Sequence, residues 1–495
     1  MRKTFAFVIY LGMFSSAYAT DETQAIVDRE ATQINVKTPE VNEPQLKLDQ
    51  LRKQELSAQT ENKNQSEIKY TARQLIEQPE ILEDLFVSAL VNANKAILPT
   101  YIKLYQLVPS ADTSLIDWAN AILLRDTNLN GSVNMYRKLL SSFPNNEYVR
   151  FQLAETLFYN QEYEAAKTQF ERLRATENIS ENDIVVFDRF IDAINNKDSW
   201  NFSFGATFLN DKNLANSAKQ GTKMALENGG VITYNSARQE GQGISAWFSA
   251  DKQWMLSDGK YTKLETGLSG KYYWDNKRYN DINTNIGFGL GYADARFNIE
   301  LIPYISKRWY AGGMNSGESL KQYSNTYGAN LSLSYWLNQN FKYSLYYDYG
   351  YDKYEHSKYD QIYSGPAHAL SNSLMYMPSA TQYWSLALDL HKKDAKDRTN
   401  AYERIGGRLI WGQEWPLGLS TQASVGIGKR NYKAGSFLGK QKNKELSTSL
   451  SVWHKELHYQ GFTPRITWSY TKTNSNLAIY SYDKHQIFFD VSKSF

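Results

Sequence analysis

The segment FKYSLYYDYG, residues 341–350, decides the fold class of the larger part of this chain. Its odd positions, beginning with Phe341, are apolar or aromatic, whereas its even positions include Lys342, Asp348 and Gly350. Side chains of a β-strand point alternately to the two faces of a sheet. The period of two therefore predicts a strand with one apolar face and one polar face.

Thirteen further segments between residues 198 and 495 show similar alternation, which makes fourteen expected strands. Their approximate ranges are 200–210, 243–254, 260–272, 282–293, 295–309, 321–337, 366–377, 381–391, 401–413, 417–429, 443–454, 458–472 and 484–494. Long strands with aromatic ends, joined by short and long connections in turn, are typical of a transmembrane barrel rather than a soluble sandwich. We expect a transmembrane antiparallel β-barrel of about 14 strands over residues 198–495, with both ends on the periplasmic side.

The alternation also predicts which charged side chains line the inside of the barrel. Where the apolar face meets lipid, the opposite face points into the lumen. The charged residues assigned to that face are Arg296, Glu300, Lys342, Asp348, Asp389, Arg404, Arg408 and Arg465. Two interpretations stay open: an interior filled with water and ion pairs, and a lining of mixed charge that lets a polypeptide of either sign pass.

Residues 71–197 show helical periodicity and contain a single glycine, Gly131. A 34-residue repeat runs through them, which is the period of tetratricopeptide helix pairs. The clearest copy begins at Glu147, and the copy before it ends at Pro144. The residues expected to pack these helices together are Leu153, Ala154, Ala166 and Phe170 in the later copy and Ala119, Ser132 and Tyr136 in the earlier one. Stacked pairs form a curved scaffold with a concave face, which predicts either a groove for a protein partner or a spacer.

The two ends of the chain carry targeting features. A basic start at Arg2 and Lys3, a short apolar stretch and a small–x–small pattern predict a signal peptide over residues 1–19, cleaved after Ala19. Residues 20–70 are polar and predict a disordered periplasmic leader. The last residue, Phe495, ends an alternating strand and resembles the insertion signal read by the outer-membrane assembly machinery. We expect a protein of the bacterial outer membrane, in contact with its lipid, with the helical domain in the periplasm.

Composition excludes several classes of function. The 495-residue chain has 55 Lys and Arg against 52 Asp and Glu, a formal net charge of +3, and no cysteine. Near-neutral charge argues against a nucleic-acid partner, which requires a basic face. The absence of cysteine excludes disulfides, thiolate catalysis and Cys-ligated metal centres. The six histidines form no zinc motif, and neither a phosphate loop nor a serine nucleophile elbow occurs. We therefore predict no enzymatic activity, no cofactor and no metal site.

Two stretches resemble the surface lipoprotein assembly modulator family. They are the repeat FPNNEYVRFQLAETLFYNQEYEAAKTQFERLRA at residues 143–175 and the first strand with its continuation, WNFSFGATFLNDKNLANSA, at residues 200–218. In that family the first strand similarly runs into an Asp- and Asn-rich segment, here Asp211, Asn213 and Asn216. The likeness lies in the order of the domains and in the general character of the sequence. It includes no catalytic motif.

The resemblance implies an outer-membrane translocator that captures a specific client in the periplasm and delivers it to the cell surface or the medium. Clients of that family are surface lipoproteins or secreted haem- or metal-capturing proteins, and this sequence does not identify which applies. Three other roles stay open: a surface receptor or host-interaction barrel that uses the loop at 210–242, a polysaccharide exporter, and a passive porin.

Overall fold

The computed structural model describes the helical repeats and the barrel. The described residues are 70–109, 111–176, 179–197, 199–226, 230–313, 316–338, 340–379, 381–454, 457 and 463–494. The predicted signal peptide with its cleavage site after Ala19, the leader up to residue 69, and Phe495 lie outside these residues.

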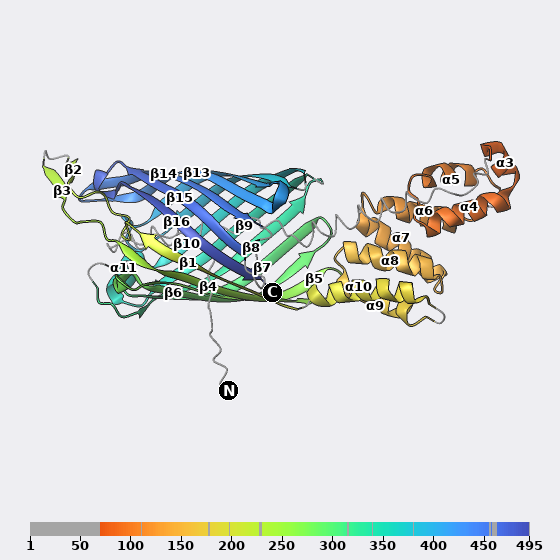
Figure 1. The fold of residues 1–495 in the computed structure, drawn as a ribbon, viewed down its shortest axis with the longest axis horizontal. Helices are drawn as coiled ribbons and strands as arrows, with labels where there is room; N and C mark the ends of the chain where they lie inside the picture. The colour runs from red at the N-terminus through yellow and green to blue at the C-terminus, as the bar shows by residue number, and fades with distance from the viewer. Residues whose placement is uncertain are drawn as a thin grey trace, which may run out of the picture.

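An elongated stack of helices forms the N-terminal part (Figure 1). The described helices are α3 (Ala72–Glu77), α4 (Pro79–Val91), α5 (Leu98–Tyr105), α6 (Thr113–Leu124), α7 (Leu129–Ser142), α8 (Glu147–Tyr159), α9 (Tyr163–Arg174) and α10 (Glu181–Lys197). The side chains of Asp112, Asn128 and Asn146 accept hydrogen bonds from the first turns of α6, α7 and α8, which fixes where each helix begins. In the part of the chain that the structure describes, no helix has both the length and the apolar character to cross a membrane.

Fourteen antiparallel strands form a closed barrel, which confirms the predicted architecture of a helical repeat region followed by a barrel. The strands are β1 (Trp200–Asp211), β4 (Gly241–Met255), β5 (Lys260–Tyr273), β6 (Asp281–Ala293), β7 (Phe297–Tyr310), β8 (Lys321–Trp336), β9 (Phe341–Tyr354), β10 (Gly365–Ser379), β11 (Gln382–Lys393), β12 (Tyr402–Glu414), β13 (Leu419–Ser436), β14 (Gly439–His454), β15 (Thr463–Ser475) and β16 (Tyr482–Ser494). The remaining strands, β2 (Thr222–Ala225) and β3 (Val231–Tyr234), form a separate hairpin that projects beyond the barrel.

The outward face of the barrel is apolar. Leu290, Leu386 and Ile427 are 64%, 62% and 63% exposed, although they lie in the middle of regular strands. A continuous band of such residues is stable only against hydrocarbon, so this face identifies the chain as an outer-membrane protein.

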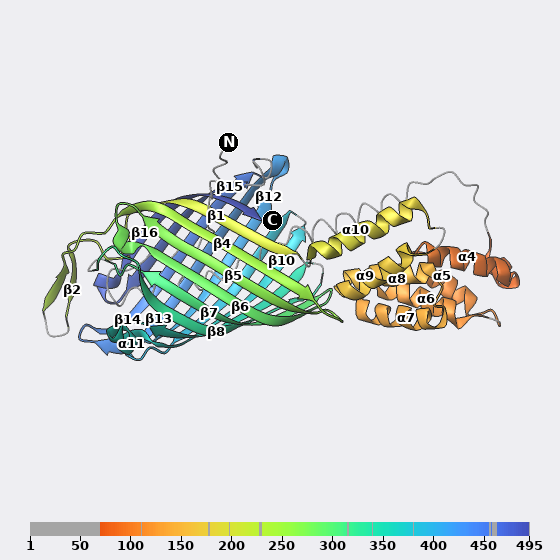
Figure 2. The same cartoon turned by 90° about the horizontal axis from the view of Figure 1, so that it is seen from below.

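The two ends of the barrel differ (Figure 2). Short turns such as 256–259 and 294–296 face the helical stack, whereas longer loops lie at the opposite end. Those loops hold the hairpin β2–β3, the short 3-10 helices η1 (Lys277–Tyr279) and η3 (Ala478–Tyr480), and the helix α11 (Ser357–Tyr363). The short-turn end with the repeats is therefore the periplasmic end, and the long-loop end is extracellular.

The strand ladder is uneven around the barrel. Each neighbouring pair joined by a turn or loop is in register over 11 to 15 residue pairs. The pair β1–β16, which closes the barrel, is in register over five pairs only, from Ser203↔Ser494 to Thr207↔Asp490. The closing seam is thus the weakest part of the wall.

Candidate functional site

The residues predicted to pack the repeats are buried where their helices meet. Ala154 and Ala166 have no exposed surface, and their small side chains let α8 and α9 approach closely. Phe170 stacks on Phe190 of α10, with ring centroids 4.6 Å apart. The other predicted packing residues, all buried by at least 98%, are Ala119, Ser132, Tyr136 and Leu153.

A buried amide that the sequence did not point to links successive repeats. The Gln152 Oε1 accepts from the Trp118 indole at 2.7 Å and from the Tyr136 hydroxyl at 3.1 Å. Its Nε2 donates to the carbonyl of Leu90 at 2.8 Å. Burial raises the pKa of Tyr136 well above its ordinary value, so the hydroxyl stays neutral and can donate. Trp118 and Gln152 are 34 residues apart, the repeat period, and this spacing was the signal that could have found the pair.

A groove of about 300 Å³ runs between α7, α8 and α9. Leu140, Leu153 and Leu157 form part of its floor, and Arg150 and Arg172 lie at its rim. Burial and the neighbouring Arg172 guanidinium lower the pKa of Arg150. Two like charges beside an apolar floor are chemically suited to a partner segment that is acidic and partly apolar.

The inward face of the barrel carries seven of the eight charged residues assigned to it. On β11, for example, Leu386 and Leu388 face outward, so the residue between Leu388 and Leu390, Asp389, points into the lumen and accepts from Ser371 at 2.7 Å. The seven on inward positions of their strands are Glu300, Lys342, Asp348, Asp389, Arg404, Arg408 and Arg465. Their contact with a passing polypeptide stays a prediction.

Arg296 is the exception. It lies in the turn before β7, its side chain is exposed, and it does not stand on the barrel wall. The Asp294 carboxylate accepts from the backbone N–H groups of Arg296 and Phe297, both at 2.8 Å. This turn breaks the alternation, so β7 begins two residues later than the sequence pattern indicated.

A belt of buried ion pairs crosses the inner wall toward the extracellular end. Each pair joins two different strands, so the pairs stabilise the wall on the extracellular side of the membrane centre. The pairs are Asp281–Arg308 at 2.9 Å, Asp352–Lys393 at 2.9 Å, Glu445–Arg404 at 2.6 Å, Glu445–Arg430 at 2.9 Å and Asp211–Lys484 at 2.5 Å. Sequence reasoning missed most of these residues because Arg308, Lys393 and Arg430 lie near or beyond the expected strand ends.

Tyrosines fill the extracellular mouth above this belt. The buried cluster consists of Tyr310, Tyr323, Tyr354, Tyr363, Tyr402 and Tyr432. Tyr363 belongs to α11, whereas the others stand at the ends of five strands, so α11 is folded inward against the strand ends. Lys396 binds Asp360 of α11 at 2.6 Å and holds the pKa of that carboxyl below its ordinary value. The extracellular mouth is therefore partly covered.

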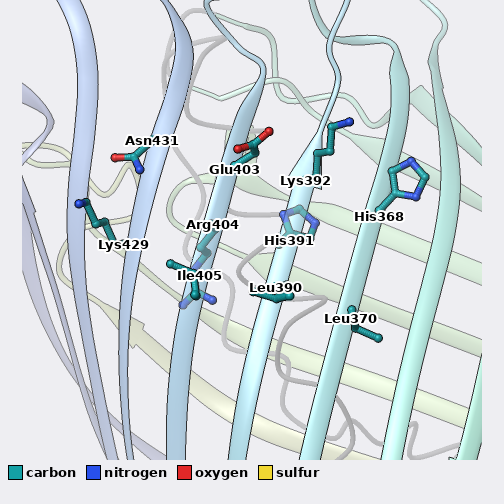
Figure 3. A pocket seen from close by; sticks show the side chains of 10 residues that line it. All are labelled: His368, Leu370, Leu390, His391, Lys392, Glu403, Arg404, Ile405, Lys429 and Asn431. Atoms are coloured by element: carbon teal, nitrogen blue, oxygen red, sulfur yellow. The ribbon is translucent and has the colours of Figure 1, made fainter.

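A shallow hollow of about 370 Å³ lies on the wall over β10–β13, as Figure 3 shows. Five polar side chains line its upper part and three apolar side chains its lower part, whereas His391 lies between them and the Arg404 guanidinium reaches down beside Ile405. The polar set is His368, Lys392, Glu403, Lys429 and Asn431, and the apolar set is Leu370, Leu390 and Ile405. This change marks the level at which the hydrocarbon of the outer leaflet ends on the barrel.

Two features of the described residues connect the repeat domain to the periplasmic end of the barrel. Helix α10 ends at Lys197 and β1 begins at Trp200, so two residues separate them in the sequence. In addition, the Gln161 side chain, between α8 and α9, donates to the carbonyl of Asp294 in the β6–β7 turn. The helical scaffold therefore lies at the periplasmic opening of the barrel (Figure 2).

The described part of the chain holds no group of three or more His, Cys, Asp or Glu side chains suited to a metal ion. Buried charges of the barrel wall pair across strands or stack on tyrosine rings, as Arg430 does over Tyr402 at 4.6 Å.

Comparison with known proteins agrees with this architecture. The family model described as surface lipoprotein assembly modifier matches residues 200–495, and the model of its N-terminal TPR repeats matches residues 68–170. The chain belongs to the surface lipoprotein assembly modifier family.

Relatives in this family match over most of their length. The chain is 39% identical to the surface lipoprotein assembly modifier 1 of Haemophilus influenzae over 436 residues, which covers 88% of this chain and 89% of that protein. It is 36% identical to the surface lipoprotein assembly modifier of Pasteurella multocida, covering 88% and 87% of the two chains. A more distant relative, the hemophilin secretion modulator of Acinetobacter baumannii, is 22% identical, with 80% and 82% covered.

Proposed function

We propose that this protein captures a surface lipoprotein in the periplasm and delivers it to the outer surface of the cell. The observation that carries the proposal is the direct joining of α10 to β1, which holds a partner-binding scaffold at the periplasmic opening of a barrel with a lumen of mixed charge. The names of the relatives support the client class, since those at 29–39% identity are named for surface lipoproteins. The hemophilin secretion modulator, named for a secreted protein, is only 22% identical.

The groove between α7, α8 and α9 is the proposed contact for the client. Its leucine floor offers apolar burial, and its arginine rim offers charge-assisted hydrogen bonds to carboxylates. The lumen then offers paired charges of both signs, so neither an acidic nor a basic segment would be held in place.

The test begins with a deletion strain. Mass spectrometry of surface-shaved and secreted proteins should find one lipoprotein lost from the surface and retained in the cell. An unchanged protein inventory would overturn the proposal. A soluble protein lost from the medium would replace the client class by a secreted protein.

Complementation then tests the groove. The double variant Arg150→Glu, Arg172→Glu should fail to restore display of that lipoprotein, because it reverses the charge of the rim. The matched control is Arg189→Glu with Lys103→Glu, which makes the same total charge change at exposed sites on α10 and α5 and should restore display. Barrel insertion is checked by heat-modifiable mobility in gels. Normal display by the double variant would remove the groove from the proposal.

A further inference from the structure

The ladder between β1 and β16 stops halfway up the wall. Both strands continue toward the extracellular end, β1 along β4 as far as Asp211 and β16 along β15 as far as Tyr482. Beyond Thr207↔Asp490, however, β1 and β16 no longer form a ladder with each other, although residues 208–211 and 482–489 are all described. The extracellular half of the seam is closed by side chains.

Two ion pairs contribute to that closure, Arg238–Asp483 at 3.1 Å and the more deeply buried Asp211–Lys484. The Lys484 Nζ lies 2.5 Å from the Asp211 Oδ2, and both side chains are only 3% exposed. Lys484 also donates to the carbonyl of Asn213 at 3.3 Å, and Gln486 donates to Asp211 at 3.3 Å. The loop after β1 thus caps the top of the gap.

The loop that forms this cap has its own framework. The Asp211 Oδ1 accepts from the Asn213 N–H at 2.9 Å, and Asn213 exchanges two hydrogen bonds with Ser217, both at 3.0 Å. The Asp- and Asn-rich segment after the first strand therefore has a defined role, which is to hold Asp211 in position for Lys484.

The wall on both sides of this gap is apolar. Leu209 and Phe488 point inward and are buried, in one cluster with Leu214, Tyr273 and Tyr279. On the lipid side, Phe208, Ile487 and Phe489 are 48%, 68% and 53% exposed. Next to the Asp211–Lys484 pair, the seam therefore provides an apolar connection between lumen and lipid.

Opening a wall of paired strands inside a membrane exposes backbone groups to hydrocarbon and is strongly disfavoured. The extracellular half of this seam has no ladder between β1 and β16 to break. Its separation requires the loss of two ion pairs, of the hydrogen bonds beside them and of side-chain packing, and the freed charges lie at the end that faces water. The seam is therefore the part of the barrel that opens at the lowest cost.

We propose that the extracellular half of the β1–β16 seam is the exit through which the acyl chains of a lipid-anchored client pass from the lumen into the outer leaflet, with Asp211–Lys484 as its latch. The inference rests on the proposed function and adds the route taken by the lipid. The polypeptide part of the client continues along the polar lumen, whereas the acyl chains favour this apolar exit because it leads them into the outer leaflet without passing through the extracellular water.

Disulfide locking tests this route. Because the natural sequence contains no cysteine, the introduced pair is the only one that can form a disulfide within the chain. Leu209→Cys with Phe488→Cys continues the register of the seam and joins its open half. The control pair is Ile427→Cys with Leu446→Cys, which are opposite each other in the β13–β14 ladder. The client is the lipoprotein lost from the surface of the deletion strain, tested with its acyl anchor and as an unlipidated version whose anchoring cysteine is replaced by serine.

Under oxidation, the disulfide formed by the Leu209→Cys, Phe488→Cys pair should reduce surface display of the lipidated client to the level of the deletion strain. It should leave export of the unlipidated version unchanged. A reductant should restore display, and the control pair should display both versions. Normal display of the lipidated client through a fully locked seam would overturn the proposal, and so would an equal block of both versions. If the first pair prevents insertion, Phe208→Cys with Phe489→Cys tests the same seam from its lipid side. If the wild-type barrel, which has no cysteine, displays no client under the same conditions, that result would instead count against the proposed function.

Discussion

At the scale of the residue, one buried amide holds three helix pairs together. Gln152 on α8 bonds to Trp118 on α6, to Tyr136 on α7 and to the last turn of α4. Because Trp118 and Gln152 occupy equivalent positions in successive repeats, the bond couples one repeat to the next. Such nearest-neighbour contacts supply much of the stability of a repeat array.

Replacing Gln152 by leucine keeps the volume similar and leaves the Trp118 indole and the Leu90 carbonyl without their hydrogen bonds. Each buried polar group left unsatisfied costs about 1–3 kcal/mol, so we expect the repeat domain to lose roughly 2–4 kcal/mol of unfolding free energy. Urea unfolding of the full chain in detergent, followed by circular dichroism at 222 nm, measures this loss. Gln106→Leu, at an exposed position after α5, is the control and should change the free energy by less than about 0.5 kcal/mol.

At the scale of the element, the strands of the seam differ from all other strands. In β13 and β14, fifteen register pairs extend over nearly the whole hairpin. In β1 and β16 the shared ladder covers the periplasmic half alone. Strands that lack a ladder on one side open locally at a lower free energy.

Hydrogen exchange should therefore divide β16 into two parts. Amides of residues 482–489 should exchange faster than those of residues 490–494, and faster than amides of β13 and β14 at the same height. Exchange mass spectrometry in detergent or nanodiscs measures the difference. Asp211→Asn should increase the exchange of the extracellular half further, because it removes the charge that Lys484 binds. Uniform protection along β16 would contradict this account of the seam.

At the scale of the whole molecule, the barrel is open toward the repeats and partly covered toward the outside. Helix α11 packs through Tyr363 against the tyrosines of the strand ends and is fastened to the next loop by the Asp360–Lys396 pair. The hairpin β2–β3 instead extends away from the mouth (Figure 1). Of these two elements, α11 is the one that we expect to limit passage.

Replacing residues 355–364 by a short Gly-Ser turn should raise the single-channel conductance of the barrel in planar bilayers, because it removes the element packed into the mouth. The matched control replaces residues 221–234, which contain β2 and β3, by a similar turn and should leave the conductance close to that of the wild type. Both variants are first checked for heat-modifiable mobility. Equal conductance of all three proteins would show that α11 does not restrict the passage.

The sequence predicted the architecture because two periodicities are strongly imposed by the surroundings. Lipid outside and water inside enforce alternation along each strand, and the repeats enforce the 34-residue period. The prediction was wrong for Arg296, since a side-chain-capped turn at Asp294 interrupts the alternation before β7 begins.

Other features of the site had no signal in the sequence. Lys393 and Arg430 lie where the strands rise above the membrane, so no apolar alternation marks their faces there. The length of the β1–β16 ladder depends on contacts between the two ends of the barrel, which local sequence does not encode. The inward folding of α11 depends on ring contacts of Tyr363 with Tyr354 and of Tyr359 with Tyr323, which the local sequence does not mark.

The order in which the barrel folds follows from the same short ladder. Every other pair of neighbouring strands is consecutive along the barrel and closes a local loop, whereas Ser203 pairs with Ser494 at the far end of the chain. Closing so long a loop carries the largest entropic cost, and only five register pairs stabilise it once it has closed. We therefore expect the seam to form last during assembly and to separate first during unfolding. The β1–β16 seam, which completes the barrel last, is then also the boundary that the folded barrel can reopen without disturbing the rest of its wall.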